Sequence, residues 1–342
     1  MTDSPLRLRL DAAALVANWT LLDRLSGAAA CGAAVKANGY GLGARGVVTR
    51  LAAAGCRDFF VASWAEARAL ADLGVTVSVL HGVRAEDMAD RPAQIRPVLA
   101  SAEQVQRWRA AGADAPCDVM VDTGMNRLGV SPQQVAEGLL DGLAIETLMS
   151  HLVSADEAVD LNARQLAAFA GLAGRTSARR RSLANSSGIA LGPDYHFDLT
   201  RPGIALYGGR QRAPHAGIAQ VVTPEAQILQ LRRVQAGETI GYNATYTAPR
   251  DMAVAILNLG YADGYLRCFS NKGIARAGAA ALPVVGRISM DLTAICVDAA
   301  PDLAEGDWVA IDYDLPATAA LSGLSQYELL TGLGARFDRV WA

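Results

Sequence analysis

Residues 31–41 read CGAAVKANGYG, and in this stretch an almost unbroken apolar run ends abruptly at one lysine, Lys36. The run has the length and composition of a buried β-strand. A lysine fixed at a strand end, with its ammonium group partly removed from water, can have its pKa drawn down from about 10.4 toward neutrality. Such an amine is a nucleophile that can form a Schiff base. The stretch therefore predicts a strand of an α/β fold that ends in a reactive lysine, although a lysine in this place is more often simply solvated.

The chain around this strand alternates between strand-like and helix-like patterns as far as residue 203. Residues 101–112, for example, have helical spacing. The strand-like segments are CGAAVKA (31–37), DFFVAS (58–63), TVSVL (76–80), IRPVLA (95–100), CDVMVD (117–122), AIETLMSHLV (144–153), RRRSLANSS (179–187) and YHFDLTRPG (195–203). Eight strands separated mostly by helices predict an α/β fold with an N-terminal (β/α)8 barrel of the TIM type. A doubly wound open sheet is the alternative.

Polar residues lie at or after the carboxyl ends of several of these strands, namely Lys36, Arg127, His151, Asn185, Ser186 and Arg201. In a closed barrel those ends meet at one face, where barrel enzymes carry their active sites. An open sheet would spread the same residues across its width. The backbone N–H groups of Gly203 and Ile204 and the hydroxyl of Ser186 could bind a phosphate there. Alternatively, these glycines are ordinary turn residues.

The pattern changes after about Gly217, where helical spacing fades and short strand-like segments are separated by turns. These segments include AQILQLRRV (226–234), MAVAILNLGY (252–261), LPVVGRISM (282–290), TAICVD (293–298) and DWVAID (307–312). The change predicts two domains, a barrel over residues 1–217 and an all-β domain over residues 218–342.

Composition excludes several classes of protein. The chain has 342 residues and 51% hydrophobic content, which is enough for two sizeable cores. A net charge of −3, with Lys and Arg dispersed, argues against nucleic acid or an anionic membrane surface as a partner. No export signal or membrane-spanning segment is expected. Five scattered cysteines without a CxxC spacing predict buried thiols in a reducing, cytoplasmic compartment, and neither disulfides nor a metal site.

A set of collinear motifs extends over nearly the whole chain. They are AVKANGYGLGA (34–44), MVDTGMNRLGV (120–130), MSHLVSADE (149–157), ANSSGIA (184–190), TRPGIALYGG (200–209), GYNATYTA (241–248), LNLGYADGY (257–265), VGRISMDLTAICV (285–297) and QYELLTGL (326–333). In this order they resemble the alanine racemase family. The resemblance implies an enzyme that uses pyridoxal 5′-phosphate and interconverts L-alanine and D-alanine, supplying D-alanine for peptidoglycan. It also implies a head-to-tail homodimer in which the β-domain of each subunit contributes to the partner's active site.

The resemblance assigns roles residue by residue. Lys36 resembles the catalytic lysine that holds the cofactor, and Tyr261 resembles the second catalytic base, donated by the other subunit. Two bases are needed because one proton leaves one face of the α-carbon and another arrives at the opposite face. The other residues similar to cofactor-binding positions are Tyr40, His151, Asn185, Ser186, Arg201, Gly203, Ile204 and Tyr327.

Within this set, Arg201 resembles the arginine that faces the pyridine nitrogen of the cofactor, and His151 the histidine next to it. Arg127, Met290 and Asp291 are similar to residues that bind the substrate. Two positions depart from the pattern: Leu42 stands where many members have histidine, and Met120 where some have a carbamylated lysine. The second departure leaves open what orients Arg127.

Three functions remain in competition at this point. The first is an amino-acid racemase, specific for alanine or of broad specificity that includes, for example, serine. The second is a pyridoxal-phosphate-dependent decarboxylase of the same fold type, although the GYADG tyrosine and the SMD motif favour the racemase. The third is a cofactor-binding protein without catalytic activity, against which the long β-domain argues.

Overall fold

The computed structural model describes residues 4–112 and 115–342, and the chain divides into two compact units. The barrel unit comprises Ala13–Ala219. The β unit joins the N-terminal segment that ends at Ala12 to Gln220–Ala342. The expected ranges of 1–217 and 218–342 differ from this division mainly at the N-terminus, where residues before Ala13 belong to the β unit.

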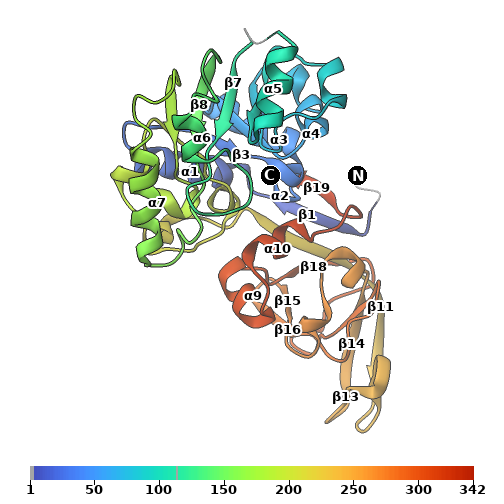
Figure 1. The fold of residues 1–342 in the computed structure, drawn as a ribbon. Coiled ribbons are helices and arrows are strands. Elements are labelled where there is room, and N and C mark those ends of the chain that lie inside the picture. The colour runs from blue at the N-terminus through green and yellow to red at the C-terminus, as the bar shows by residue number, and fades with distance from the viewer. Residues whose placement is uncertain (1–3, 113–114) are drawn as a thin grey trace. The chain divides into compact units, whose positions relative to one another are not determined.

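Parallel strands form the centre of the barrel unit, with helices on the outside (Figure 1). Seven of them pair in chain order, and a further pair, β10–β2, lies beside them. Their bounds are β2 (Ala30–Cys31), β3 (Ala33–Ala34), β4 (Asp58–Val61), β5 (Thr76–Val79), β6 (Ile95–Leu99), β7 (Cys117–Met120), β8 (Ile145–Met149), β9 (Arg180–Ser182) and β10 (Leu199–Thr200). Side chains such as Phe59, Val77 and Val119 are fully buried in them, as expected for parallel strands covered on both faces.

The sheet closes into a barrel. Strand β10 pairs in parallel with β2, with Leu199 opposite Ala30. On its other side, the N–H of Asp198 donates to the carbonyl of Arg181 at 3.0 Å, which joins β10 to β9. The first barrel strand is interrupted at Gly32, where a Cβ atom would lie 2.8 Å from the carbonyl oxygen of Asp58. The prediction of a closed barrel is therefore confirmed over the open sheet.

Several helices of the barrel unit begin at polar caps that the sequence supplies. Ser63, Ser101 and Ser131 each accept a hydrogen bond from the backbone at the third helical residue, and Pro132 follows Ser131 at the first helical position. The helices are α1 (Ala12–Ser26), α2 (Lys36–Tyr40), α3 (Ala44–Ala54), α4 (Trp64–Arg68), α5 (Ala102–Ala110), α6 (Pro132–Ala136), α7 (Asp160–Ala170) and α8 (Ser186–Ile189).

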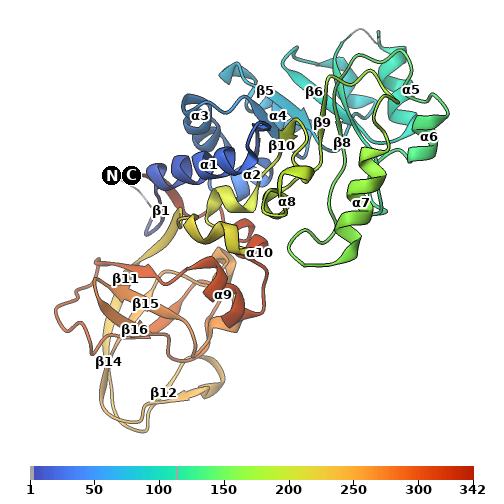
Figure 2. The same cartoon turned by 90° about the vertical axis from the view of Figure 1, so that its left-hand side faces the viewer.

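The β unit is built on a sheet in which the strand order is β16-β15-β18-β11-β1-β19, with β14 pairing β11 and β17 (Figure 2). Strand β11 (Val222–Val234) is long enough to pair first with β1 and β18 and then, past an irregularity between Ile228 and Gln230, with β14. The other elements are β1 (Leu6–Leu10), β12 (Thr239–Ile240), β13 (Tyr246–Thr247), β14 (Met252–Leu257), β15 (Ile274–Ala277), β16 (Ala280–Pro283), β17 (Thr293–Cys296), β18 (Trp308–Ile311), α9 (Leu315–Ser322), α10 (Gln326–Thr331) and β19 (Asp338–Trp341). The predicted all-β character is confirmed, with two short helices added near the C-terminus.

Strand β1 explains why the N-terminal segment belongs to the β unit. It pairs antiparallel with β11 and parallel with β19, so it lies in the interior of the sheet. Its alternating residues Leu6, Leu8 and Leu10 are fully buried. Such a strand buries one face in the core of this unit and gains hydrogen bonds on both sides.

Candidate active site

The short segment α2, which follows the first barrel strand, is a left-handed turn over residues 37–40, directly after Lys36. The backbone φ angles of Ala37, Asn38, Gly39 and Tyr40 are 52°, 54°, 66° and 53°. This region costs an L-residue roughly 1–2 kcal/mol, so the surrounding structure must stabilise Ala37 and Tyr40 in it. The sequence predicted a strand through residue 37, whereas the strand ends at Ala34.

Two side chains stabilise this turn. The carboxylate of Glu66 accepts the N–H of Ala37 at 2.6 Å and also accepts the N–H groups of Ala62 and Ser63. The side-chain oxygen of Asn38 accepts the N–H of Ala44 at 2.9 Å, at the start of α3. The turn is therefore anchored to two helices, and the backbone that carries Lys36 is fixed although its side chain is exposed.

Four of the predicted residues come together electrostatically at the carboxyl ends of the barrel strands. Partial removal of the Lys36 ammonium group from water and the charge of Arg127 lower the pKa of Lys36, while Glu66 opposes the shift. Burial, together with Arg201, Arg127 and Lys36, lowers the pKa of His151 to about 3. Three cations and a neutral imidazole therefore gather at this face, and such a group attracts anions.

We expect the neutrality of His151 to make stability depend on pH. An unfolded imidazole binds a proton below pH 6.5, whereas the folded one does so only near pH 3, so the unfolded state binds more protons between these values. The folded state therefore loses stability as the pH falls through this window. Between pH 7 and pH 5, cofactor-free protein should lose about 1–2 kcal/mol more than the His151→Gln variant in urea unfolding. Equal losses in the two proteins would contradict the assignment.

Arg201 is buried directly behind this face. Its guanidinium donates to the hydroxyl of Ser182 and, at 2.6 Å, to the carbonyl of Ser150. Burial lowers the pKa of Arg201 to about 10, with Asp118 opposing the shift, so the group remains charged at neutral pH. The two hydrogen bonds to Ser182 and Ser150 fix the orientation of the guanidinium, because both residues belong to the barrel wall.

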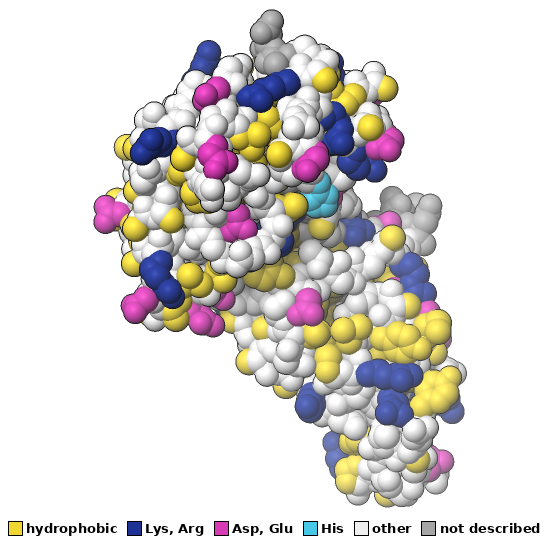
Figure 3. Space-filling model, in the orientation of Figure 1, with side chains coloured by type: hydrophobic (Ala, Val, Ile, Leu, Met, Phe, Trp, Pro, Cys, Tyr) yellow, Lys and Arg dark blue, Asp and Glu magenta, His cyan; other side chains and the backbone are white. Residues whose placement is uncertain are grey.

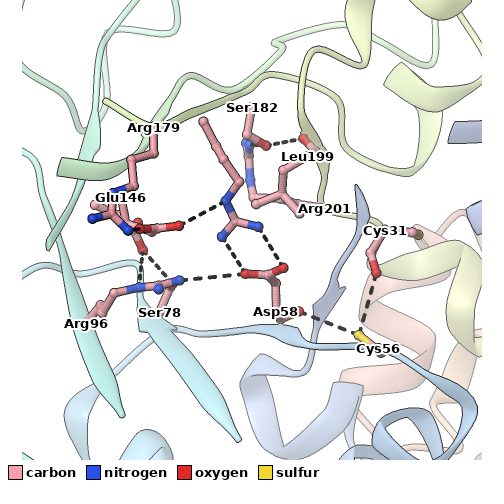
Figure 4. A network of polar contacts seen from close by, with 12 residues as sticks. Cys31, Cys56, Asp58, Ser78, Arg96, Glu146, Arg179, Ser182, Leu199 and Arg201 are labelled. Atoms are coloured by element: carbon pink, nitrogen blue, oxygen red, sulfur yellow. Dashed lines mark hydrogen bonds and ion pairs between the residues drawn. The ribbon is translucent and has the colours of Figure 1, made fainter. Parts of the chain in front are cut away.

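Further into the barrel, a network of ion pairs continues from this region (Figure 4). Arg180 contacts Asp58 through two hydrogen bonds of 3.0 and 2.7 Å. Arg96 lies 3.7 Å from Asp58 and 3.5 Å from Asp118. Such charges are tolerated inside a barrel because each is paired.

The surface of the barrel unit has no single dominant charge on the face in Figure 3, where basic and acidic side chains are interspersed.

A cradle for an anion is formed by Tyr40, Ser186, Gly203 and Ile204. The hydroxyl oxygen of Ser186 accepts the N–H groups of Gly203 and Ala205 at 2.9 and 3.3 Å, so its own proton is available to another acceptor. Among the residues that the structure describes, no acceptor is recorded for the N–H of Ile204. A Cβ atom on Gly203 would collide with the hydroxyl of Tyr40. The absence of a side chain at Gly203 lets Tyr40 approach, and the arrangement supplies convergent donors for an anion.

Asn185 has a structural place next to this cradle. Its side-chain oxygen accepts the N–H of Gly188 at 2.8 Å and caps helix α8. The ring of Tyr40 stacks on Tyr207 with 4.6 Å between ring centroids, and the Tyr207 hydroxyl donates to the carbonyl of Ala34. These contacts fix the two walls of the cradle.

The remaining predicted residues, Tyr261, Met290, Asp291 and Tyr327, lie in the β unit. The N–H of Ala262, next to Tyr261, donates to the carbonyl of Met290 at 3.0 Å, and a guanidinium from Arg267 lies 4.9 Å from the centre of the Tyr261 ring. Arg336 bridges Asp263 and Asp291. Tyr261, Met290 and Asp291 thus belong to one surface region, while Tyr327 lies on α10.

Several residues of the site were not anticipated from the sequence. Glu66 belongs to a Ser63-x-x-Glu66 capping box, a pattern that could have been recognised. Asp122, which accepts the N–H groups of Gly124, Met125 and Arg127, has the turn signature of an Asp followed by Thr-Gly. Arg336 gave no signal, because its partners lie 73 and 45 residues away in the chain.

Taken together, the barrel and its strand-end residues define a class of enzyme. A lysine with a lowered pKa, a buried arginine and a cradle of hydrogen-bond donors at the carboxyl ends of the strands are the features expected of a barrel enzyme that performs amine chemistry with a phosphate-bearing ligand. No group of three or more His, Cys, Asp or Glu side chains that could hold a metal ion occurs among the described residues. Over the same residues, no helix has the length and apolar character needed to span a membrane.

Comparison with known proteins identifies the family. Residues 10–211 match the model of the alanine racemase N-terminal domain, and residues 221–341 match that of the alanine racemase C-terminal domain. An alanine racemase from Acidiphilium cryptum is 43% identical, over 97% of this chain and 98% of its own length. The biosynthetic alanine racemase of Agrobacterium fabrum is 39% identical, over 98% and 93%. The chain belongs to the alanine racemase family.

Solved structures agree with this assignment. The alanine racemase of Bartonella henselae, determined with covalently bound pyridoxal phosphate, has a TM-score of 0.89 and 34% identity, and the match covers 100% of both chains. The biosynthetic alanine racemase of Pseudomonas aeruginosa has a TM-score of 0.87 and 33% identity over 99% of both chains. The predicted family, fold and enzyme class are therefore confirmed.

Proposed function

We propose that this protein interconverts L-alanine and D-alanine with pyridoxal 5′-phosphate and supplies D-alanine for peptidoglycan. The observation that carries the proposal is the convergence of Lys36, Arg127, His151 and Arg201 at the barrel face that also holds the phosphate cradle. The relatives named above are alanine racemases, one of them with this cofactor covalently bound.

The residues present fit pyridoxal phosphate. The hydroxyl of Ser186, the N–H of Ile204 and the hydroxyl of Tyr40, which lies against Gly203, suit its phosphate. Arg201 is the charged donor that would face the pyridine nitrogen, and Lys36 is the amine that would hold the aldehyde carbon. Asn185 and His151 would support this set, and Tyr327 would add to the phosphate contacts. When bound, the cofactor withdraws electrons from the α-carbon of an amino acid and makes its hydrogen acidic.

The chain's own residues then move the proton. Lys36 takes or returns it on one face of the α-carbon, and the lowered pKa of Lys36 favours this role. Tyr261 from a second copy of the chain serves the opposite face. Arg127 binds the substrate carboxylate, a task that suits a planar and permanently charged group. Met290 and Asp291 of the second copy line the substrate pocket.

This mechanism requires a homodimer with shared active sites. The exposure of Met290 and Leu292, at 55% and 41%, next to Tyr261 supports a partner surface there, because large apolar side chains grouped on a surface favour burial in an interface.

The five free cysteines support a reducing, cytoplasmic location.

Substrate preference provides the test of function. If Met290 and Tyr327 close the side-chain pocket, alanine should be racemised fastest, and serine about a hundredfold more slowly, because an apolar pocket rejects a small added hydroxyl only modestly. Lysine and arginine should be poor substrates, since each forced methylene costs about 1–3 kcal/mol. The measurement is chiral analysis of product from a panel of L- and D-amino acids.

A decarboxylation assay on the same panel serves as the control. Release of carbon dioxide without racemisation would replace the proposed reaction by that of the decarboxylases with this fold type. Equal rates for alanine and lysine would show a broad-specificity racemase and would remove the narrow-pocket argument.

A further inference from the structure

One buried side chain joins the two loops that carry Arg127 and His151. Gln165 on helix α7 is fully buried. Its amide nitrogen donates to the carbonyl of His151 at 3.0 Å and to the hydroxyl of Thr123 at 3.3 Å, and its amide oxygen accepts the N–H of Val153 at 2.9 Å. Both amide hydrogens and the amide oxygen are therefore used, and every partner lies in a loop after β7 or β8.

The connection extends from Gln165 to Arg201. The Thr123 hydroxyl is 2.7 Å from the hydroxyl of Ser150, and the carbonyl of Ser150 accepts a hydrogen bond from Arg201 at 2.6 Å. One chain of hydrogen bonds, which starts at Gln165, thus links the loop after β7 (residues 121–131, the β7 loop), the loop after β8 (residues 150–159, the β8 loop) and the buried Arg201.

The β7 loop needs such a link. Arg127 is exposed, and Met120, which ends β7, offers it no charged partner. Asp122 organises the start of the loop by accepting the N–H groups of Gly124, Met125 and Arg127, but these bonds are internal to the loop. The contact from Thr123 to Gln165 and Ser150 instead ties the loop to the neighbouring one.

We propose that Gln165 is a positioning residue for racemisation, which holds the loop of Arg127 in register with His151 and Arg201. The proposal rests on the function proposed above. The chemistry of the position favours an amide: the β8 loop presents both a carbonyl and an N–H, so its partner must donate and accept at once. A carboxylate could not donate to the His151 carbonyl.

The same helix supplies a matched control. Asn162 is also buried, and its amide donates to the carbonyls of Ser154 and Glu157 at 3.1 and 2.9 Å. It therefore tethers the same β8 loop to α7 through two donated hydrogen bonds. Both of these partners follow β8, so these bonds, unlike those of Gln165, do not extend to the β7 loop.

The test compares Gln165→Met with Asn162→Leu in the holoenzyme. Both changes keep side-chain size and remove the hydrogen bonds. Gln165→Met should raise KM for alanine about tenfold with kcat within about threefold, because a displaced Arg127 mainly weakens binding of the carboxylate. Asn162→Leu should change KM by less than about twofold, although both variants should unfold at similarly lowered temperatures. Equal effects of the two variants on KM would overturn the proposal.

A second measurement does not depend on activity. Amide hydrogen exchange in residues 121–130 should increase in Gln165→Met and stay unchanged in Asn162→Leu. Unchanged exchange there in both variants would overturn the bridge. If the wild-type protein fails to racemise alanine, the proposed function fails, while this exchange experiment still decides whether the bridge exists.

Thr123→Val is the variant to use if Gln165→Met does not fold. It removes the hydroxyl that contacts Gln165 and Ser150 and preserves the shape of the side chain. It should raise KM for alanine to a similar extent, and the double variant should show no further increase, because both substitutions break one connection. Fully additive effects on KM would show that the two residues act separately and would overturn the proposal.

Discussion

Lys36→Ala should lower kcat for alanine racemisation by at least about 1,000-fold. The variant loses the amine that holds the cofactor aldehyde and the group that moves a proton on one face of the α-carbon, and a single positioned acid or base is commonly worth about 100-fold to 10,000-fold. Lys36→Arg should be nearly as inactive. It retains a positive charge in the cluster with Arg127, but a guanidinium neither forms the bond to the aldehyde nor releases a proton near neutral pH.

The chain makes this assignment unusually easy to check, because Lys36 and Lys272 are its only lysines. Borohydride reduction of the holoenzyme should fix the cofactor irreversibly on the peptide that contains Lys36, as read by mass spectrometry. Lys272 is exposed in the β unit, and Lys272→Arg is the matched control, expected to retain full activity and full labelling. A label on the Lys272 peptide would disprove the role given to Lys36.

Tyr261→Phe should reduce racemisation by about 100-fold to 10,000-fold, because it removes one proton-transferring hydroxyl and leaves the ring beside Arg267. The loss should also be one-sided. The resemblance implies that the lysine serves D-alanine and the tyrosine L-alanine, so exchange of the α-hydrogen in deuterated water should be nearly abolished for L-alanine and retained for D-alanine. Nuclear magnetic resonance measures the two exchange rates separately.

Tyr242→Phe is the control for this experiment. Tyr242 lies in the same unit, is 67% exposed and should tolerate loss of its hydroxyl without a change in either exchange rate. Equal loss of exchange for both enantiomers in Tyr261→Phe would mean that the tyrosine is not the base of one particular face. Mixing the inactive Lys36→Ala and Tyr261→Phe proteins extends the test, since a heterodimer with shared sites would regain one native site. No recovery after demonstrated subunit exchange would contradict the shared site.

The sequence was sufficient to predict the barrel because its strands are short apolar runs bounded by clear helix signals, as at residues 95–100 and 101–112. It did not predict the place of β1. The alternation in Leu6, Leu8 and Leu10 is compatible with any half-buried strand, and the partners of this strand, β11 and β19, lie more than 200 residues away. Pairing over such a distance leaves no local pattern.

The candidate site likewise contains residues that the sequence could predict and residues that it could not. Residues at strand ends, such as Lys36 and Arg201, were found because barrel topology places those ends together. Gln165 was not, since in LNARQLAAF it looks like one more polar position of an amphipathic helix. The left-handed turn after Lys36 was also missed. Asn38, Gly39 and Gly41 suit positive φ angles, but Ala37 and Tyr40 adopt them only because Glu66 and the packing on Tyr207 stabilise the turn.

The position of β1 between β11 and β19 also determines when the sheet of the β unit can form during synthesis. Strand β1 precedes the barrel residues in the chain, whereas its partners β11 and β19 follow them, and the N–H of Ala342 donates to the carbonyl of Leu10 at 2.8 Å. The barrel residues 13–219 are contiguous and have their own core, so they can fold during translation. Strand β1 therefore has neither partner while the barrel residues are made, and it gains β11 before β19. Until β11 is made, the nascent chain carries an unpaired, leucine-rich strand, which is a natural target for a chaperone at the ribosomal exit.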